Sequence, residues 1–380
     1  MVASETFHNE KNVIDQITER RKSIGIIAYA PSKSEGGYTL FAPLTGGGAV
    51  YLIDERGNIA HRWRRNVRPG RHAVLLQNGN LGYDGVDPDA EILYPFWHVW
   101  HGGLFQEVTP DDKVVWEYRD PGHHHDAVWL PDGHLIYATA EKLPEETAEC
   151  LREKLGTLGE GMPLVGDVVK EVDREGQLVW VWRSWEHIDP AIFPFEPIMP
   201  RYHWPYVNGL AKTHTGLVLM SLRVTSGIIA VNPKSGEIVW RVGRDIAAQQ
   251  HAPAELGNGN ILAFDNGNYR PGNSTPFSRV VEFSPSGKVI WEYRDQVAPS
   301  FFTPYMGNAQ RLPGGNTLVN EAAFGRLFEV TPEGETVWEY VIPFFDRYPA
   351  DVERVYGEKG YHNSVFKAFR YQKHEIPWMR

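Results

Sequence analysis

The chain has 380 residues, of which 42% are hydrophobic and 23% are charged, proportions that exclude a fibrous or wholly disordered protein. Its 38 lysines and arginines against 48 aspartates and glutamates give a net charge of −10, with no basic block, which argues against a nucleic-acid partner. No stretch approaches the roughly 20 apolar residues of a membrane helix. The polar N-terminus lacks the apolar core of a signal peptide, and Cys150 is the single cysteine. We therefore expect a cytoplasmic protein with no membrane segment and no intrachain disulfide.

Repeated hairpins follow one another along the chain. Residues 1–36 form an N-terminal extension, and its segment 15–26 (DQITERRKSIGI) is compatible with a helix that packs on the propeller or on a second subunit. Residues 37–43 (GYTLFAP) then form a single strand. Hairpins whose second strand carries tryptophan recur at 49–65, 104–120, 168–184, 228–244, 279–295 and 326–342. Hairpins with a glycine-containing turn alternate with them at 72–85, 125–140, 208–223, 251–266 and 307–322. A last single strand at 362–371 precedes a tail at 372–380.

One hairpin of each kind makes a four-stranded antiparallel sheet, with strands A, B, C and D in chain order. The strand at 37–43 is a strand B that lacks its strand A, and the strand at 362–371 is a strand A that lacks its sheet. The sequence therefore predicts an all-β fold, a six-bladed β-propeller over residues 37–371, closed by pairing of its N- and C-terminal strands. Two stacked sandwiches would explain the repeats but not the two matching single strands.

The long connections all fall on one face of this propeller. The A–B and C–D turns are short. The long insertions are all B–C or D–A connections, at 86–102, 141–165, 184–206, 266–278 and 343–361. They are rich in aromatic residues and proline, which argues against disorder, and long ordered loops are commonly functional. We expect them to form a funnel that holds the functional site.

Polar residues open the innermost strands on that same face. His125, His251 and His362 share one position in alternate blades, and Asn208 occupies it in a fourth. A single histidine at a strand end is more often a hydrogen-bonded turn residue than a catalyst, but three equivalent ones facing one channel raise the odds of a functional role. Asn308 also opens a strand, and an asparagine there commonly bonds the adjacent backbone.

Other funnel residues complete a candidate site. Arg223 ends a strand B, where either an oxyanion ligand or a surface ion pair would suit it. Trp204 and the tryptophans on either side of position 99, Trp97 and Trp100, offer ring faces for an aromatic substrate. Imidazole is a nucleophile and a base near neutral pH, and guanidinium binds tetrahedral oxyanions through two parallel hydrogen bonds. No phosphate-binding glycine loop, G-x-S-x-G or H-E-x-x-H motif occurs.

Three segments resemble the bacterial arylsulfotransferase family. They are HHDAVWLPDGHLIY, SLRVTSGIIAVNPKSGEIVWRVG and QQHAPAELGNGNILAFDNG, and the similarity extends in order over roughly residues 37–371. The resemblance implies a six-bladed propeller that transfers a sulfuryl group from an aryl sulfate to a phenol through a sulfated histidine, without a cofactor. It makes His251 the nucleophile, Arg223 a ligand of the sulfuryl oxygens, and His125 or His124 a ligand of the same oxygens or of the departing phenolate. Tyr206 stands where the family has a catalytic histidine, beside the retained Asn208.

Three alternatives remain open. One is a hydrolase or lyase for a small aromatic or anionic molecule, with His251 as base and Tyr206 as acid. Another is a metal enzyme in which His125, His251 and His362 bind a divalent ion. The third, a non-catalytic scaffold, is disfavoured by histidines at the axis. The sequence indicates neither the substrate nor whether the chain forms a homo-oligomer.

Overall fold

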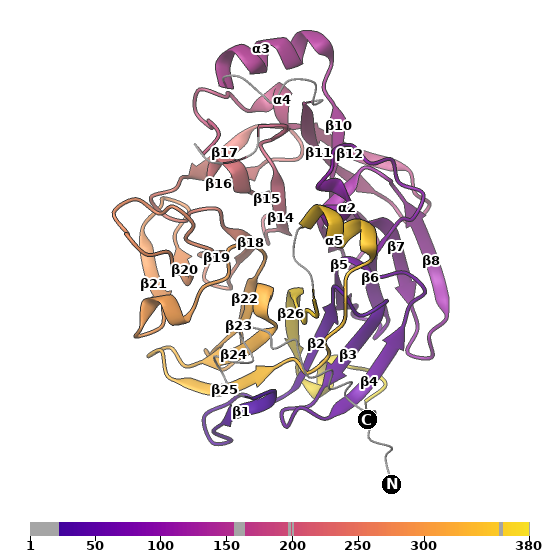
Figure 1. The fold of residues 1–380 in the computed structure, drawn as a ribbon, viewed down its shortest axis with the longest axis vertical. Helices are drawn as coiled ribbons and strands as arrows, with labels where there is room; N and C mark the ends of the chain where they lie inside the picture. The colour runs from indigo at the N-terminus through magenta and orange to yellow at the C-terminus, as the bar shows by residue number, and fades with distance from the viewer. Residues whose placement is uncertain (1–22, 156–163, 197–198, 200, 357–359, 380) are drawn as a thin grey trace.

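The computed structural model describes residues 23–155, 164–196, 199, 201–356 and 360–379. Six antiparallel sheets stand around a central axis, confirming the predicted six-bladed propeller (Figure 1). No helix among these residues is long and apolar enough to cross a membrane.

Each blade extends outward from an innermost strand beside the axis. From the inside outward, the first blade contains β26 (Val365–Tyr371), β2 (Tyr38–Pro43), β3 (Ala49–Ile53) and β4 (Ile59–Arg64). In the same order, the second contains β5 (Pro69–Leu75), β6 (Leu81–Val86), β7 (Gly103–Val108) and β8 (Val114–Arg119). The third contains β9 (His123–Trp129), β10 (Leu135–Lys142), β11 (Val165–Val172) and β12 (Leu178–Arg183), with β13 (His203–Trp204) parallel to β11.

The remaining blades follow the same plan. The fourth contains β14 (Val207–Lys212), β15 (Val218–Leu222), β16 (Gly227–Val231) and β17 (Ile238–Val242). The fifth contains β18 (His251–Glu255), β19 (Ile261–Asp265), β20 (Arg279–Phe283) and β21 (Val289–Tyr293). The sixth contains β22 (Asn308–Arg311), β23 (Thr317–Glu321), β24 (Arg326–Val330), β25 (Thr336–Val341) and β1 (Gly25–Tyr29).

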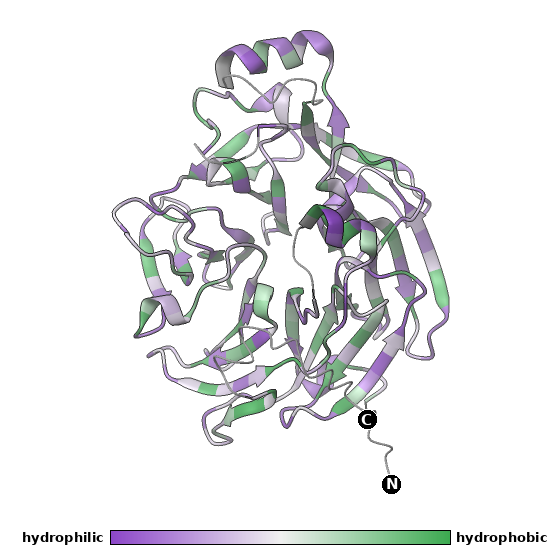
Figure 2. Cartoon of the chain, in the orientation of Figure 1, coloured by the Kyte–Doolittle hydropathy of each residue, from purple (hydrophilic) through white to green (hydrophobic). Residues whose placement is uncertain are grey.

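Helical segments lie in the connections. They are α2 (Trp97–Trp100), α3 (Glu145–Leu155), α4 (Ser184–His187), α5 (Ala350–Tyr356), and the 3₁₀ turns η1 (Arg223–Thr225), η2 (Ala298–Ser300), η3 (Ala322–Phe324) and η4 (Lys373–Glu375). The helix α3 carries the exposed Cys150 and projects from the third blade with a mostly hydrophilic surface (Figure 2). The helices α2 and α5 contact each other over the centre of the ring, where His98 Nδ1 lies 3.1 Å from Asp351 Oδ2 (Figure 1).

The ring closes as predicted, by pairing of β26 with β2. The register places Tyr371 opposite Tyr38 and Phe369 opposite Leu40. This pairing covers the edge that β2 would otherwise expose, and an exposed edge is a template for aggregation.

The N-terminal extension contributes a strand to the propeller. The helix expected at 15–26 falls mostly on residues 1–22, outside the described part, and its last two residues belong to Gly25–Tyr29, the strand β1, which pairs antiparallel with β25 on the outer edge of the sixth blade. The following turn stays on that blade, because the Glu35 carboxylate accepts hydrogen bonds from the backbone of Gly314 and Asn316. The propeller therefore includes residues upstream of 37, since the free edge of β25 offers a ladder of backbone groups that a helix could not satisfy.

The repeated tryptophan has a structural role that explains its recurrence. In five blades its indole N–H donates to a backbone carbonyl in the C–D turn of the next blade, and the five pairs are Trp63 to Thr109, Trp116 to Arg174, Trp182 to Gly236, Trp291 to Pro332 and Trp338 to Glu55. A large ring that also satisfies its one donor suits the space between twisted blades. The last pair joins the sixth blade to the first and so supports closure.

The innermost strands are irregular on the funnel side. Pairing with the next strand is interrupted by a bulge in β5, β9, β14, β18 and β26, and only β22 pairs regularly among the six. Two of the residues at these bulges, His125 (φ 59°) and Ala252 (φ 48°), have positive φ, as do Tyr206 (70°) and Met306 (62°) just before innermost strands. A bulge re-aims side chains, and positive φ in non-glycine residues commonly marks a functional site.

Candidate active site

A small cavity lies on the axis at the funnel mouth. It has about 250 Å³ of empty space, and its lining residues come from all around the ring: Arg71, Trp100, His125, Tyr206, Arg223, His251, Tyr305, Met306 and Phe366. Four of the residues singled out from the sequence, namely His125, Tyr206, Arg223 and His251, therefore meet at one place.

His251 is held in a defined tautomer. The amide nitrogen of Asn266 donates to the carbonyls of Thr303 and Met306, so its oxygen faces His251 Nδ1 at 2.7 Å, and Nδ1 must carry the proton. Nε2 then carries the lone pair, which accepts a hydrogen bond from the Met306 backbone N–H at 3.2 Å. Burial, with the Arg223 charge added to it, holds the His251 pKa well below its usual range. The imidazole is therefore neutral, as a nucleophile must be.

Two guanidinium groups flank this imidazole. Arg223 follows β15 in η1 and donates to the Pro304 carbonyl at 3.4 Å and toward Met199 Sδ at 3.9 Å. Arg71 lies at the β5 bulge, is 2% exposed, donates to the Val99 carbonyl at 2.5 Å and has its charged carbon 5.6 Å from the Trp100 and Phe366 ring centres. Two cations at a mostly apolar cavity favour an anionic ligand.

His125 forms the opposite wall. Its ring stacks on Trp100 with centroids 5.7 Å apart and meets Tyr206 edge-on at 4.9 Å. Burial, with His124 and Arg71 nearby, lowers the His125 pKa well below its usual range. Burial also raises the pKa of the Tyr206 phenol, so Tyr206 is a neutral hydrogen-bond donor at neutral pH.

A buried carboxylate stands behind this wall. Asp167 Oδ1 lies 3.0 Å from both His124 Nε2 and His203 Nε2, and Oδ2 accepts the Tyr206 backbone N–H at 2.6 Å. Burial alone would raise the Asp167 pKa, but the His203 and His124 imidazoles hold it below its usual range. On the far side, the Tyr94 hydroxyl lies 2.9 Å from His203 Nδ1.

Several predicted site residues lie elsewhere. His362 precedes β26, pairs with Asp346 in an isolated bridge and packs on Tyr348 at 5.4 Å, whereas Phe366 occupies the cavity position of that blade. Asn208 and Asn308 each donate from the side chain to a backbone carbonyl of the next innermost strand or its approach.

The tryptophan predictions have a mixed outcome. Trp204 is fully buried and donates to the Phe193 carbonyl, away from the cavity. Trp100 lines the cavity, and Trp97 is buried beside His124. Val99, between them in α2, packs in the core with Val352 of α5.

The sequence reasoning did not select Arg71, Asp167, His203, Asn266 or Phe366. Arg71 had a detectable signal, since it opens a strand A in the way that His125 does. Asp167 lies inside a strand C and His203 in a long connection, so neither belongs to a repeated position.

The described residues contain one group with three potential metal-ligand atoms close together. It is His124, Asp167 and His203, whose atoms lie within 4.8 Å of one another. This is a different set from the histidines expected to bind a divalent ion. Two hydrogen bonds to Asp167, from His203 and the Tyr206 backbone, and the close contact with His124 also account for this arrangement. The three side chains are fully buried.

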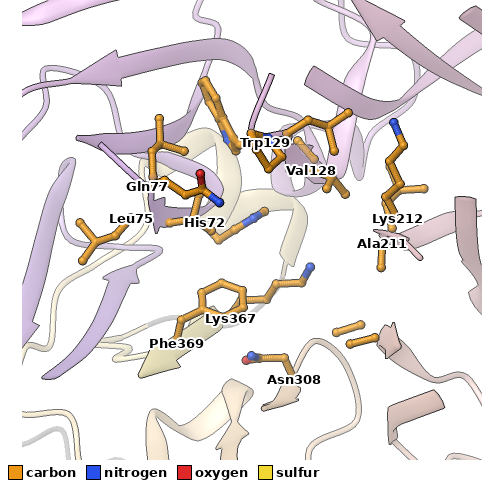
Figure 3. A pocket seen from close by; sticks show the side chains of 18 of the residues that line it. His72, Leu75, Gln77, Val128, Trp129, Ala211, Lys212, Asn308, Lys367 and Phe369 are labelled. Atoms are coloured by element: carbon orange, nitrogen blue, oxygen red, sulfur yellow. The ribbon is translucent and has the colours of Figure 1, made fainter. Parts of the chain in front are cut away.

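A larger cavity opens at the other mouth of the channel. It has about 1530 Å³ of empty space, lies between the ends of the innermost strands and the short A–B turns, and is lined by His72, Trp129, Lys212, Lys367 and others (Figure 3). Its buried ammonium is paired, since Lys367 Nζ lies 2.5 Å from Asp126 Oδ2, and His72 stands between Asp84 and Asp126 at 3.3 and 3.7 Å. It is roomier than the funnel cavity but lacks a convergent set of reactive groups.

Comparison with known structures supports the fold. A protein of unknown function from Bacteroides caccae superimposes with a TM-score of 0.53 at 14% identity, covering 80% of this chain and 93% of that chain. A streptogramin B lyase gives 0.46 at 9% identity, covering 84% and 82%, and virginiamycin B lyase from Staphylococcus aureus gives 0.40 at 11%, covering 72% and 69%. At 14% identity the first of these likenesses concerns the fold alone.

Comparison with families is more specific. No curated protein matches the chain. The model of the family described as Arylsulfotransferase (ASST) matches residues 113–248 and 243–341, which is more than half of the sequence and includes His125, Tyr206, Arg223 and His251. The chain belongs to the arylsulfotransferase family.

Proposed function

We propose that this protein transfers a sulfuryl group from an aryl sulfate to a phenol, with His251 as the nucleophile. The observation that carries the proposal is the state of His251: a neutral imidazole whose unprotonated Nε2 accepts one hydrogen bond among the described residues, from the Met306 backbone N–H, in a cavity that Arg223 also lines, in an arylsulfotransferase-family chain. Attack on sulfur would replace this one hydrogen bond.

The first half-reaction follows from this geometry. His251 Nε2 attacks sulfur, an N–S bond forms, and the S–O bond to the ring breaks with its electron pair leaving on the phenolate oxygen. Arg223 and Arg71 offset the negative charge of the sulfuryl and phenolate oxygens. The Tyr206 hydroxyl donates a hydrogen bond to one of these oxygens, and the Trp100, Phe366 and Tyr305 rings hold the aryl group.

In the second half-reaction a phenol attacks the sulfur of the sulfated histidine. The N–S bond breaks, its electrons return to Nε2, and the phenolic proton passes to a base in the cavity. No metal or other cofactor takes part in this scheme.

Mass spectrometry tests the proposal directly. After mixing with a chromogenic aryl sulfate and no acceptor, the peptide that contains His251 should gain the mass of one sulfuryl group, and adding a phenol should remove it. Release of free sulfate with no modified peptide would instead indicate the alternative hydrolase, with His251 as base and Tyr206 as acid.

A further inference from the structure

A line of closely spaced polar groups, one close ion-pair contact and one hydrogen bond, joins the buried carboxylate to the cavity. Asp167 Oδ1 lies 3.0 Å from His124 Nε2, and His124 Nδ1 lies 2.8 Å from His125 Nδ1. All three side chains are buried, and His125 is the one that lines the cavity.

The partners determine which ring nitrogens carry protons. An ionised carboxylate only accepts, so His124 Nε2 carries the hydrogen that faces Asp167. His124 Nδ1 is then an acceptor, and the hydrogen between the two rings belongs to His125 Nδ1. The remaining nitrogen, His125 Nε2, is left with a lone pair at the opposite end of the ring.

Neighbouring groups keep this arrangement from reversing. The reverse tautomer would place the His124 Nε2 lone pair against the Asp167 carboxylate, which also accepts from His203 and from the Tyr206 backbone. The β9 bulge and the positive φ of His125 set two consecutive histidine rings nearly perpendicular, at 83°. This contact requires the irregular backbone, because consecutive residues of a regular strand point to opposite faces.

We propose that Asp167 and His124 form a relay that makes His125 the general base for the acceptor phenol. The inference rests on the proposed sulfuryl transfer. In the second half-reaction the phenol O–H bond breaks, its proton bonds to His125 Nε2, its oxygen bonds to sulfur, and the N–S electron pair returns to His251. The proton is then lost to solvent, which balances the proton taken up by the phenolate released earlier.

The buried charge of Asp167 offsets part of the cost of this step. Burial, His124 and Arg71 lower the His125 pKa and so oppose an imidazolium there, and the carboxylate stabilises that cation through His124 as the proton is transferred. Asp167 and His124 are thus positioning residues, in the way that the triad aspartate of a serine protease fixes a tautomer without itself taking the proton.

Separating the two half-reactions tests the relay. Rapid mixing with 4-nitrophenyl sulfate follows the first as a burst of nitrophenolate, and adding phenols of different acidity follows the second. Asp167→Asn should leave the burst rate within a few-fold and slow transfer to un-ionised phenols by roughly 100-fold, the usual worth of a general base. Phenols already ionised at the assay pH should be nearly unaffected, because they need no base.

Controls separate this role from a structural one. His124→Gln should show the same dependence on acceptor acidity, and circular dichroism of each variant reports whether it folds. Asp84→Asn removes another buried carboxyl of the channel, one whose pKa burial raises well above its usual range, and should slow neither half-reaction.

The outcomes are distinguishable. If the wild-type protein gives no burst, the proposed function fails. If it gives a burst but folded Asp167→Asn slows both half-reactions alike, or slows all phenols equally, the relay is wrong. Stoichiometric metal in the purified wild-type protein, lost in Asp167→Asn, would also overturn it, because a metal would occupy the nitrogen and oxygen lone pairs that the relay uses.

Discussion

The two mouths of the central channel are built differently. At the funnel mouth five innermost strands are bulged, α2 and α5 lie over the axis, and the cavity has about 250 Å³. At the other mouth the turns are short and the cavity has about 1530 Å³ of empty space by the same measure. The larger space carries mutually paired charges, whereas the smaller one gathers two imidazoles, two guanidiniums and two phenols. Irregular backbone and convergent polar groups locate this site better than volume does.

The largest expected effect comes from removing β26, an innermost strand that runs between the two mouths of the channel. Deleting residues 362–380 removes β26, exposes the edge of β2, and leaves the Asn308 and Gln310 side chains without their backbone partners at Ala368 and Arg370. We expect insoluble protein, measured as the soluble fraction after expression. Deleting only 372–380 should give soluble protein with a lower melting temperature, since that tail packs Ile376 and Trp378 on the core beside β2. A soluble, normally folded product of the longer deletion would contradict the closure.

The second effect concerns the nucleophile. His251→Ala should lower turnover of an aryl sulfate by about 10³-fold or more while the circular dichroism spectrum is unchanged, as loss of a nucleophile usually does. His214→Ala is the matched control at the other mouth, where that exposed imidazole bonds Glu255. Full activity in His251→Ala would remove the assignment of the site.

The third prediction tests whether the cation at the funnel mouth must be a guanidinium group. Arg223→Lys should lower kcat/KM for an aryl sulfate by about 100-fold, because a point charge does not replace two parallel hydrogen bonds. Arg174→Lys changes an arginine that lines the other cavity and pairs with Glu107, and it should leave kcat/KM unchanged. Equal effects of the two variants would contradict the distinction between the mouths.

The sequence could predict the fold because each blade repeats its turn glycine and its tryptophan. It could predict that His125 and His251 meet, since both precede a turn glycine that sets the register of their strand. The prediction misplaced His362 because β26 pairs with β2, from the beginning of the propeller, so no A–B turn follows β26 to fix the register of its residues. The bulge in β26 then brings Phe366 to the cavity.

Aligning the repeated strands could not identify the other residues of the site. Asp167 and His203 act through contacts between a strand C and a long connection, and bulges leave no mark in the spacing of turns. Arg71 occupied the right position but was not recognised, since cations at a strand end also form surface ion pairs.

The fourth effect is a dependence of stability on pH. Burial lowers the pKa of His72, His123, His125 and His251 well below the usual value, and that of His101 to about 3. The unfolded chain takes up protons below about pH 6.5 that these folded imidazoles refuse, so stability present above that pH is lost as pH falls. Asp84 acts in the opposite sense, because its raised pKa makes the folded state bind a proton first.

Denaturant unfolding at several pH values measures this effect. The histidines outnumber Asp84, so the free energy of unfolding should fall between pH 7 and 5, by up to ~1.4 kcal/mol per pH unit for each buried histidine. His251→Gln should reduce the slope. A free energy of unfolding that is flat or rises over this range would contradict the neutral, buried state of these imidazoles.

The smallest effect concerns the residue at which the chain departs from its family. Tyr206 stands between His203 and His125, with ring centroids 4.6 and 4.9 Å away, and its φ of 70° is one that histidine also adopts. Tyr206→His should therefore fold and raise transfer from aryl sulfates to phenols a few-fold, because it adds an imidazole and space beside the sulfuryl group. Tyr206→Phe, which removes only the hydroxyl, should lower the same rate, and Phe369→Leu at the other mouth should leave it unchanged. If Tyr206→His instead abolished a native activity and gained no sulfuryl transfer, Tyr206 would belong to a different reaction, and the funnel would have kept the family's nucleophile and arginine for a new substrate.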